Sequence, residues 1–227
     1  MGYTRSEIID ECKTAFQNIS TFYKQPFINY RGKTEDTDEY FTEVIAEFLR
    51  GRITEFMNGI TAITRESSYK TPAHDGIIKD LDSGREEEII AMKMYDKQYD
   101  YIGKIIDYQT PLKNKRTDEA GKIDLLAYDG TTLRILELKK PDSTETMLRC
   151  VLEGYTYLKT ANLSKLLSNF EKPIDSIVKA CPFVFRNGEQ HSEMREQRPY
   201  LKRLMDLLDS KPYYISEING TFFVTEE

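Results

Sequence analysis

Two acidic residues and a lysine interrupt the most apolar part of this sequence. Asp124 lies within IDLLAY, and Glu137 and Lys139 lie within LRILELKK. Such aliphatic segments are normally buried, and a buried charge costs several kcal/mol unless it is paired or bound to a ligand. Two adjacent carboxylates favour a shared proton or a bound cation, and Mg²⁺ or Mn²⁺ prefers oxygen ligands. With a lysine to meet a phosphate or polarise water, these residue types can support metal-assisted phosphodiester cleavage.

A β-hairpin is the element that must position these three side chains. Asp129-Gly130 separates the two apolar segments and predicts a two-residue type I′ turn, which needs positive φ at both positions. With this loop, Tyr128 lies opposite Thr131. Counting back along both strands then places Asp124 opposite Ile135.

Strand alternation predicts that Asp124, Glu137 and Lys139 point to one face of the hairpin. Asp124 and Glu137 become diagonal neighbours, about 7–8 Å apart at the backbone. Lys140 alternates to the other face, where we expect a structural or solvated role. We expect Lys139→Ala to retain the fold. A surface salt bridge at protruding strand ends is the alternative interpretation.

The first sixty residues predict two helices, over 6–23 and 38–60, because their apolar residues recur at helical spacing. Simple packing helices are one interpretation, and a homodimer or partner surface is the other. The segment 67–85 breaks the pattern and marks the best seam. We therefore predict an N-terminal helical segment over 1–75 and a second domain over 76–227.

In the second domain, the sequence pattern predicts a helix at 85–98, a strand at 101–112, a basic loop at 113–121 and then the hairpin. A helix is predicted over 140–160, where Asp142 and Glu145 have the spacing of a capping box. A strand at 176–186, a helix at 195–208, and strands at 212–218 and 221–227 follow, the last two joined at Asn219-Gly220. This order predicts an α/β (α+β) fold with a mixed sheet.

Composition excludes several classes of function. A net charge of −6 and a pI near 5.2 argue against broad coating of nucleic acid, although a local basic cleft remains compatible. Three distant cysteines (Cys12, Cys150 and Cys181) and two histidines (His74 and His191) favour neither a disulfide framework nor a zinc cluster. With no apolar segment near ~20 residues and no signal-peptide pattern, we expect a cytoplasmic protein without a membrane span.

The hairpin pattern resembles the PD-(D/E)XK nuclease superfamily. The resemblance lies in Ile123-Asp124, twelve intervening residues and Glu137-Leu138-Lys139, within an element order that is similar over 85–159. It implies a restriction-endonuclease-like mixed central sheet flanked by helices. It also implies Mg²⁺- or Mn²⁺-dependent hydrolysis of nucleic acid, with DNA as the expected substrate.

The resemblance also implies roles for individual residues. Asp124 and Glu137 would be metal ligands with the Leu138 carbonyl as a third, and Lys139 would orient or deprotonate the attacking water. The acid expected on the first helix is Glu87, with Glu86 as its rival. Glutamates that open a helix are also favoured by the helix dipole alone.

Two features of the sequence depart from the family pattern. Ile123 replaces the proline, and the helix after the motif offers Arg149 and Glu153 where many relatives carry Gln. Arg149 could reach a phosphate or pair with Glu153 at i,i+4 spacing. Lys115 and Arg116, in the basic loop, are further candidates for contact with nucleic acid.

Two other classes of protein compete with the nuclease. A noncatalytic nucleic-acid-binding or assembly module could use the same fold, and the acidic pI favours it. Two adjacent carboxylates oppose it, because they repel phosphate. A helical interaction protein is the third class, supported by the first sixty residues alone.

Overall fold

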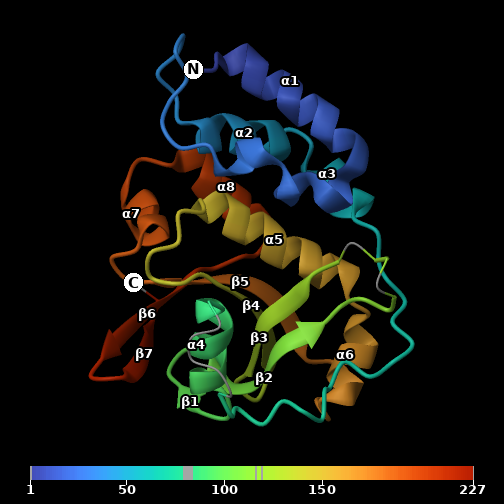
Figure 1. The fold of residues 1–227 in the computed structure, drawn as a ribbon. Helices are drawn as coiled ribbons and strands as arrows, with labels where there is room; N and C mark the ends of the chain where they lie inside the picture. Colours follow the sequence, from blue (N-terminus) through green and yellow to red (C-terminus); the bar gives the residue numbers. More distant parts are fainter. Residues whose placement is uncertain (1, 79–83, 116, 119, 227) are drawn as a thin grey trace.

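A seven-stranded sheet forms the centre of the molecule in the computed structural model, which describes residues 2–78, 84–115, 117–118 and 120–226 (Figure 1). Within these residues the strands lie side by side in chain order. They are β1 Gln98–Tyr99, β2 Gly103–Pro111, β3 Lys122–Tyr128, β4 Thr132–Leu138, β5 Ile177–Phe185, β6 Tyr213–Ile218 and β7 Thr221–Thr225. The β4–β5 and β5–β6 pairs are parallel and the others antiparallel. The predicted mixed sheet is confirmed.

Helical crossovers join the parallel strands, as the geometry of parallel pairing requires. α5 (Met147–Thr160) and α6 (Leu163–Asn169) connect β4 to β5, and α7 (Glu189–Arg195) and α8 (Pro199–Leu207) connect β5 to β6. The turn between β6 and β7 has positive φ at both Asn219 (51°) and Gly220 (76°). This matches the predicted Asn-Gly hairpin.

The two faces of the sheet are covered differently (Figure 1). Leu126 and Ile135 belong to the apolar cluster shared with α5 and the N-terminal helices, whereas Leu125 and Leu136 belong to the cluster that includes α4 (Glu86–Met94). Because side chains alternate along β3 and β4, each strand contributes residues to both apolar clusters. Both strands are therefore buried on both faces.

The predicted N-terminal helices are each interrupted. The first divides into α1 (Arg5–Ala15) and a 3₁₀ segment (Phe16–Lys24), with non-helical backbone at Asn18. The second divides at Gly51-Arg52 into α2 (Phe41–Arg50) and α3 (Ile53–Gly59), and a short 3₁₀ turn (Pro26–Asn29) precedes it. The predicted helix 85–98 is shorter too, because Asp96, at a φ of 62°, turns the chain after Met94 toward β1.

The apolar stripes of the N-terminal helices are buried within this chain. Ile8, Phe16 and Val44 lie in the same cluster as residues of α5 and α8, so this core crosses the predicted boundary at residue 75. A homodimer through these helices stays a prediction. Among the described residues, no helix combines the length and apolar character that a membrane span requires.

Candidate functional site

The hairpin turn lies one residue later than predicted. Gly130 has a φ of 106°, but Asp129 does not adopt positive φ, so the predicted type I′ turn is wrong. The Asp129 carboxylate instead accepts hydrogen bonds from the backbone N–H groups of Thr131 and Thr132, at 2.9 and 2.8 Å. A short polar side chain thus closes the loop without a second left-handed residue.

The pairing of β3 with β4 shifts accordingly by two residues. Tyr128 pairs with Leu133, and the ladder continues to Leu125 opposite Leu136. A shift of two residues preserves which face each side chain occupies. Asp124 and Glu137 therefore still share a face, although the predicted partners were wrong.

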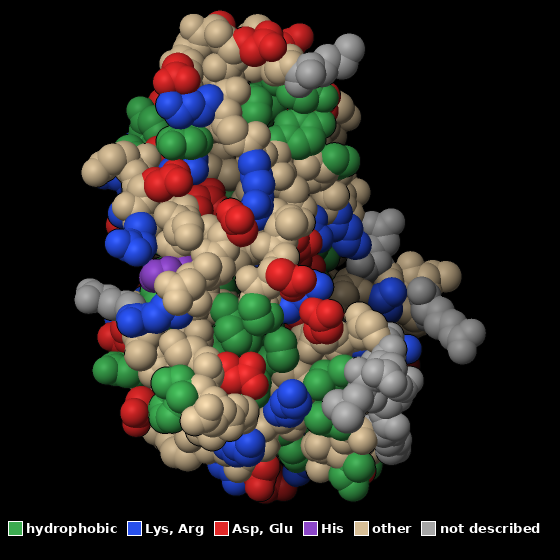
Figure 2. All heavy atoms as spheres, turned by 60° about the vertical axis from the view of Figure 1, so that its left-hand side comes forward, with side chains coloured by type: hydrophobic (Ala, Val, Ile, Leu, Met, Phe, Trp, Pro, Cys, Tyr) green, Lys and Arg blue, Asp and Glu red, His purple; other side chains and the backbone are tan. Residues whose placement is uncertain are grey.

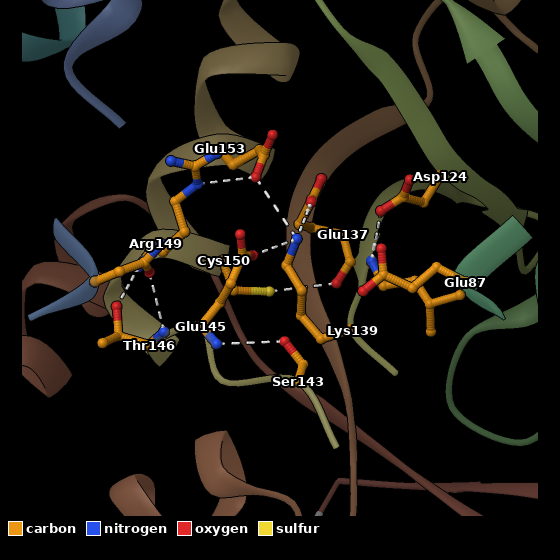
Figure 3. A network of polar contacts seen from close by, with 12 residues as sticks. Glu87, Asp124, Glu137, Lys139, Ser143, Glu145, Thr146, Arg149, Cys150 and Glu153 are labelled. Carbon is orange, nitrogen blue, oxygen red and sulfur yellow. Dashed lines mark hydrogen bonds and ion pairs between the residues drawn. The ribbon is translucent and has the colours of Figure 1, made fainter. Parts of the chain in front are cut away.

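Lys139 lies at the centre of a buried charge network (Figure 3). Its residue surface is only 5% exposed. Its Nζ lies 2.8 Å from Glu137 Oε1, 2.8 Å from Glu145 Oε2 and 3.6 Å from Glu153 Oε2. Figure 3 shows the amino group directed toward Glu153 on α5, with Asp124 and Glu87 together on the side of Lys139 opposite Arg149.

Arg149 completes the α5 side of the network. Its Nε donates to Glu153 Oε2 at 3.1 Å, and a terminal nitrogen donates to the carbonyl of Tyr23. Tyr157 donates its hydroxyl to the other oxygen of Glu153 at 2.7 Å. The i,i+4 pair considered for Arg149 is present, so its guanidinium is already bound on the protein side.

Helix α5 begins later than predicted, and this frees Glu145 for the network. The helix starts at Met147 with Thr146 as N-cap, whose Oγ1 accepts from Arg149 N at 3.1 Å, so the predicted capping box at Asp142 is wrong. Glu145 instead reaches Lys139. Pairing a buried ammonium outweighs a helix cap, which contributes about 1 kcal/mol.

Asp124 lines a cavity of about 360 Å³ between β3 and the start of α4. Its Oδ2 accepts from Leu138 N at 3.0 Å, and its Oδ1 accepts from Gln109 Nε2 at 3.1 Å. Glu87 and Lys140 line the same cavity. We call this cavity the acidic notch. It is lined by side chains from β2, β3, the segment after β4, and α4.

Gln109 is a site residue that the sequence did not reveal. Its φ of 49° is unusual for a non-glycine residue in a strand, and its amide holds Asp124. Left-handed backbone at a non-glycine residue costs about 1–3 kcal/mol and is concentrated at functional sites. A hydrogen-bonded buried carboxylate next to strained backbone marks this end of the sheet.

The structure separates the two glutamates that competed on α4. Glu87 is half-buried and its Oε1 accepts from Lys140 N at 3.2 Å, whereas Glu86 is exposed and lies 2.9 Å from Lys140 Nζ. Lys140 also lies 3.2 Å from Asp142 and faces away from the Lys139 network, as alternation predicts. Glu87 thus reaches the edge of the site while Glu86 stays on the surface.

Burial dominates the electrostatics of the site. It raises the pKa of Asp124 to about 7 and, reinforced by Asp124 and Glu153, raises the pKa of Glu137 well above its usual range. Burial also raises the pKa of Glu87. For Lys139, burial acts against the charge, but Glu137 and its neighbours prevail and raise the pKa well above the usual value. Lys139 is therefore a cation at neutral pH.

The site offers oxygen donors of the kind that a hard divalent ion prefers. Five carboxylates (Glu87, Asp124, Glu137, Glu145 and Glu153) surround two cations (Lys139 and Arg149). Glu137 Oε2 is buried without a hydrogen-bond partner among the described residues. No three His, Cys, Asp or Glu side chains within those residues enclose a metal position, but Mg²⁺ is commonly held by one or two carboxylates plus waters.

Of the two nucleic-acid contacts predicted in the basic loop, Lys115 is among the described residues and takes no part in the charge network. Lys115 is exposed in the loop after β2, where its backbone N–H donates to Asp118 at 2.7 Å. Arg116 lies outside the described residues. Glu145 and Glu153 were absent from the predicted site, since the helix spacing gave Glu153 only as a partner of Arg149 and Glu145 only as a cap.

Comparison of this chain with family models, with curated proteins and with solved structures gives no match. Its site is therefore interpreted from its own geometry.

Proposed function

We propose that this protein is a metal-dependent nuclease that hydrolyses phosphodiester bonds of nucleic acid, with DNA as the expected substrate. The observation that carries the proposal is the meeting of Asp124, Glu137 and Lys139 at the ends of two neighbouring buried strands. Burying one cation among several carboxylates costs free energy that a purely structural strand end would avoid. Such groups are retained where chemistry needs them.

The order of elements supports a restriction-endonuclease-like fold. After α4 and the two-residue β1 come the antiparallel strands β2, β3 and β4, with the acidic residues on and beside β3 and β4, and α5 leads to β5, which pairs parallel with β4. This is the element order that the resemblance implies. The N-terminal helices and the β6–β7 hairpin are additions to it.

Asp124 and Glu137, with the Leu138 carbonyl, would hold the metal ion directly, and Glu87 at the edge would hold it through a water molecule. When bound, Mg²⁺ or Mn²⁺ would supply positive charge for the phosphoryl oxygens and lower the pKa of water. Water oxygen would form a bond to phosphorus as the phosphorus–oxygen bond to the leaving group breaks. Gln109 would keep Asp124 oriented while this occurs.

The protonation states assign different roles to Lys139 and Glu87. Lys139 is held as a cation, so it would donate a hydrogen bond to a phosphoryl oxygen and stabilise developing negative charge. The deprotonating role that the resemblance implied fits Glu87 better, because its raised pKa suits acceptance of a proton from water in the acidic notch. The leaving oxygen would take its proton from solvent.

Metal-dependent cleavage, read together with metal binding, tests this proposal. Calorimetry should show Mn²⁺ binding to the wild type, loss of binding in Asp124→Asn and weaker binding in Glu87→Gln. Glu86→Gln is the matched control and should behave as the wild type, because Glu86 pairs with Lys140 at the surface. Binding without cleavage by the wild type would leave the second candidate.

A noncatalytic nucleic-acid-binding or assembly module is that second candidate. The observation that favours it is the neutralisation of both buried cations: Lys139 by Glu137 and Glu145, and Arg149 by Glu153. Figure 2 adds that acidic and basic side chains are interspersed on the face shown, without a broad area of one sign. A surface of mixed charge suits weak or partner-assisted contact.

A further inference from the structure

A second cavity, here called the histidine groove, adjoins the acidic notch. It measures about 390 Å³, within the usual size range of ligand sites. Arg85, Glu88 and Gln109 line both cavities, so the two are neighbours along the same side of α4 and β2. The segment after α3 passes the edge of β2 before it reaches this side (Figure 1).

His74 and Asp107 form an oriented pair at this groove. His74 Nδ1 lies 2.7 Å from Asp107 Oδ1, and Asp107 is 2% exposed. Thr110 donates to the other oxygen of Asp107 at 2.6 Å, and the imidazole stacks on Tyr108 with a centroid separation of 4.5 Å. Because these contacts fix the ring through Nδ1, Nε2 is the atom left for a ligand. It has no partner among the described residues.

The other lining groups suit a nucleotide. Ile77 and Met92 give the groove an apolar surface against which a base can pack, and the buried Tyr108 ring supports the imidazole from behind. Lys122 lies at its rim and forms no ion pair with any residue that the structure describes. The remaining charges are engaged: Arg85 lies 3.6 Å from Glu88, and Asp75 accepts from Ile77 N at 2.9 Å.

We propose that the histidine groove binds the nucleotide next to the cleaved bond, with His74 Nε2 as its polar anchor and Lys122 as its phosphate contact. This inference rests on the proposed function, because it makes the groove the continuation of the acidic notch. Asp107 acts as a positioning residue that holds the imidazole. The base packs against Ile77 and Met92, beside the imidazole.

Nuclear magnetic resonance can observe the anchor directly, because the chain has two histidines. The probe is thymidine 5′-monophosphate, titrated into the ¹⁵N-labelled wild-type protein. The imidazole signals of His74 should shift saturably, and those of His191 should not. Neither histidine shifting, or both shifting equally, would overturn the proposal.

Binding of a short fluorescein-labelled oligothymidylate, followed by anisotropy in the Asp124→Asn background, provides the second test. His74→Gln should weaken binding about tenfold, the loss of one good hydrogen bond. Lys122→Ala should weaken it and reduce its salt dependence. His191→Gln is the matched control and should leave the Kd within about twofold.

The melting temperature distinguishes a binding role of His74 from a purely structural role. If His74→Gln lowers the melting temperature but leaves the Kd unchanged, His74 merely fixes the segment to β2 and the proposal fails. Mn²⁺-dependent cleavage that survives His74→Gln at unchanged KM would also overturn the groove but leave the proposed function intact. Oligonucleotide binding that needs His74 in a protein that never cleaves would refute the nuclease and support the groove.

Discussion

At the residue scale, the burial of Lys139 distinguishes this site from a solvent-exposed cluster of charges. Its ammonium lies among Glu137, Glu145 and Glu153, and little of it reaches solvent. Breaking a buried ion pair by removing one partner leaves an uncompensated charge and is strongly destabilising. The expectation that Lys139→Ala leaves the fold unaffected needs revision.

We predict that Lys139→Met lowers the free energy of unfolding by about 3–5 kcal/mol near neutral pH, because several buried carboxylates lose the cation that pairs with them. The loss should be smaller at pH 5 than at pH 7, because the raised pKa of Glu137 favours its uncharged form as pH falls. Urea unfolding at both pH values measures this. Lys140→Met is the matched control, and an equally small loss from both substitutions would contradict the buried network.

Asp124 should make the metal-free protein less stable as pH rises. Its pKa is raised from 3.8 to about 7, so the folded state holds this proton more tightly than the unfolded state. The resulting stabilisation is complete below about pH 4 and is lost as pH rises through 7. Asp124→Asn should therefore be more stable than the wild type at pH 8 in EDTA, by up to about 3 kcal/mol, and similar at pH 4. Urea titrations at the two pH values would refute this if the variant were the less stable protein at pH 8.

The shared face of Asp124 and Glu137 could be predicted, and their surroundings could not. Strand alternation survives a two-residue error in pairing, which is why a wrong turn still gave the right face. Glu145 and Gln109 escaped prediction because their roles depend on where a loop and a strained strand residue lie in three dimensions. No spacing rule in the sequence encodes either position.

At the element scale, β2 is packed tightly against the turn end of the β3–β4 hairpin. Gly103 opens β2 at a φ of 85°, and a Cβ there would lie 2.3 Å from the carbonyl oxygen of Tyr128. Gly130 has a φ of 106°, and a Cβ added there would have no atom of another part of the chain within 4 Å. Both residues need glycine's backbone freedom, but only Gly103 also needs the space.

Gly103→Ala should consequently destabilise the protein more than Gly130→Ala. Backbone strain alone should cost about 1–3 kcal/mol at Gly130. The clash at Gly103 should add at least about 2 kcal/mol, because backbone atoms of β3 must move. Chemical denaturation of the two variants gives the comparison. Equal losses would mean that β2 and the hairpin are not packed as described.

Long periodic elements were predictable, and short ones were not. α8 and the Asn-Gly hairpin agree with the sequence, and α5 agrees except at its start, because each carries a repeated apolar pattern or a specific turn signal. α6 and α7 have seven residues each, too few for helical periodicity to show. The breaks at Asn18 and Gly51-Arg52 follow from packing that continuous apolar stripes conceal.

At the scale of the whole molecule, the N-terminal helices share a core with the sheet. Phe22, Phe56 and Tyr155 lie in one aromatic group that joins this segment to α5. The domain boundary at residue 75 is predicted because the helical pattern of the sequence breaks there. The core contacts that cross this boundary depend on the tertiary fold, which the local pattern does not encode.

We predict that the fragment 76–227 does not fold cooperatively on its own. Removing residues 1–75 would expose the apolar surfaces of α5 and α8, which the N-terminal helices cover. Circular dichroism during thermal unfolding should show a broad, non-cooperative change for the fragment and a single sharp transition for the full chain. A fragment with a sharp transition would show that residues 1–75 are a separate appendage.

Cleavage is the measurement that tests the central claim most directly. Labelled single- and double-stranded DNA and RNA are incubated with the full chain and Mg²⁺ or Mn²⁺, and with Asp124→Asn as the matched variant. We predict cleavage of at least one substrate by the wild type, no cleavage in EDTA, and a rate at least about a hundredfold lower for Asp124→Asn. A wild-type protein that binds Mn²⁺ yet is as inert as Asp124→Asn on all four substrates would contradict the account.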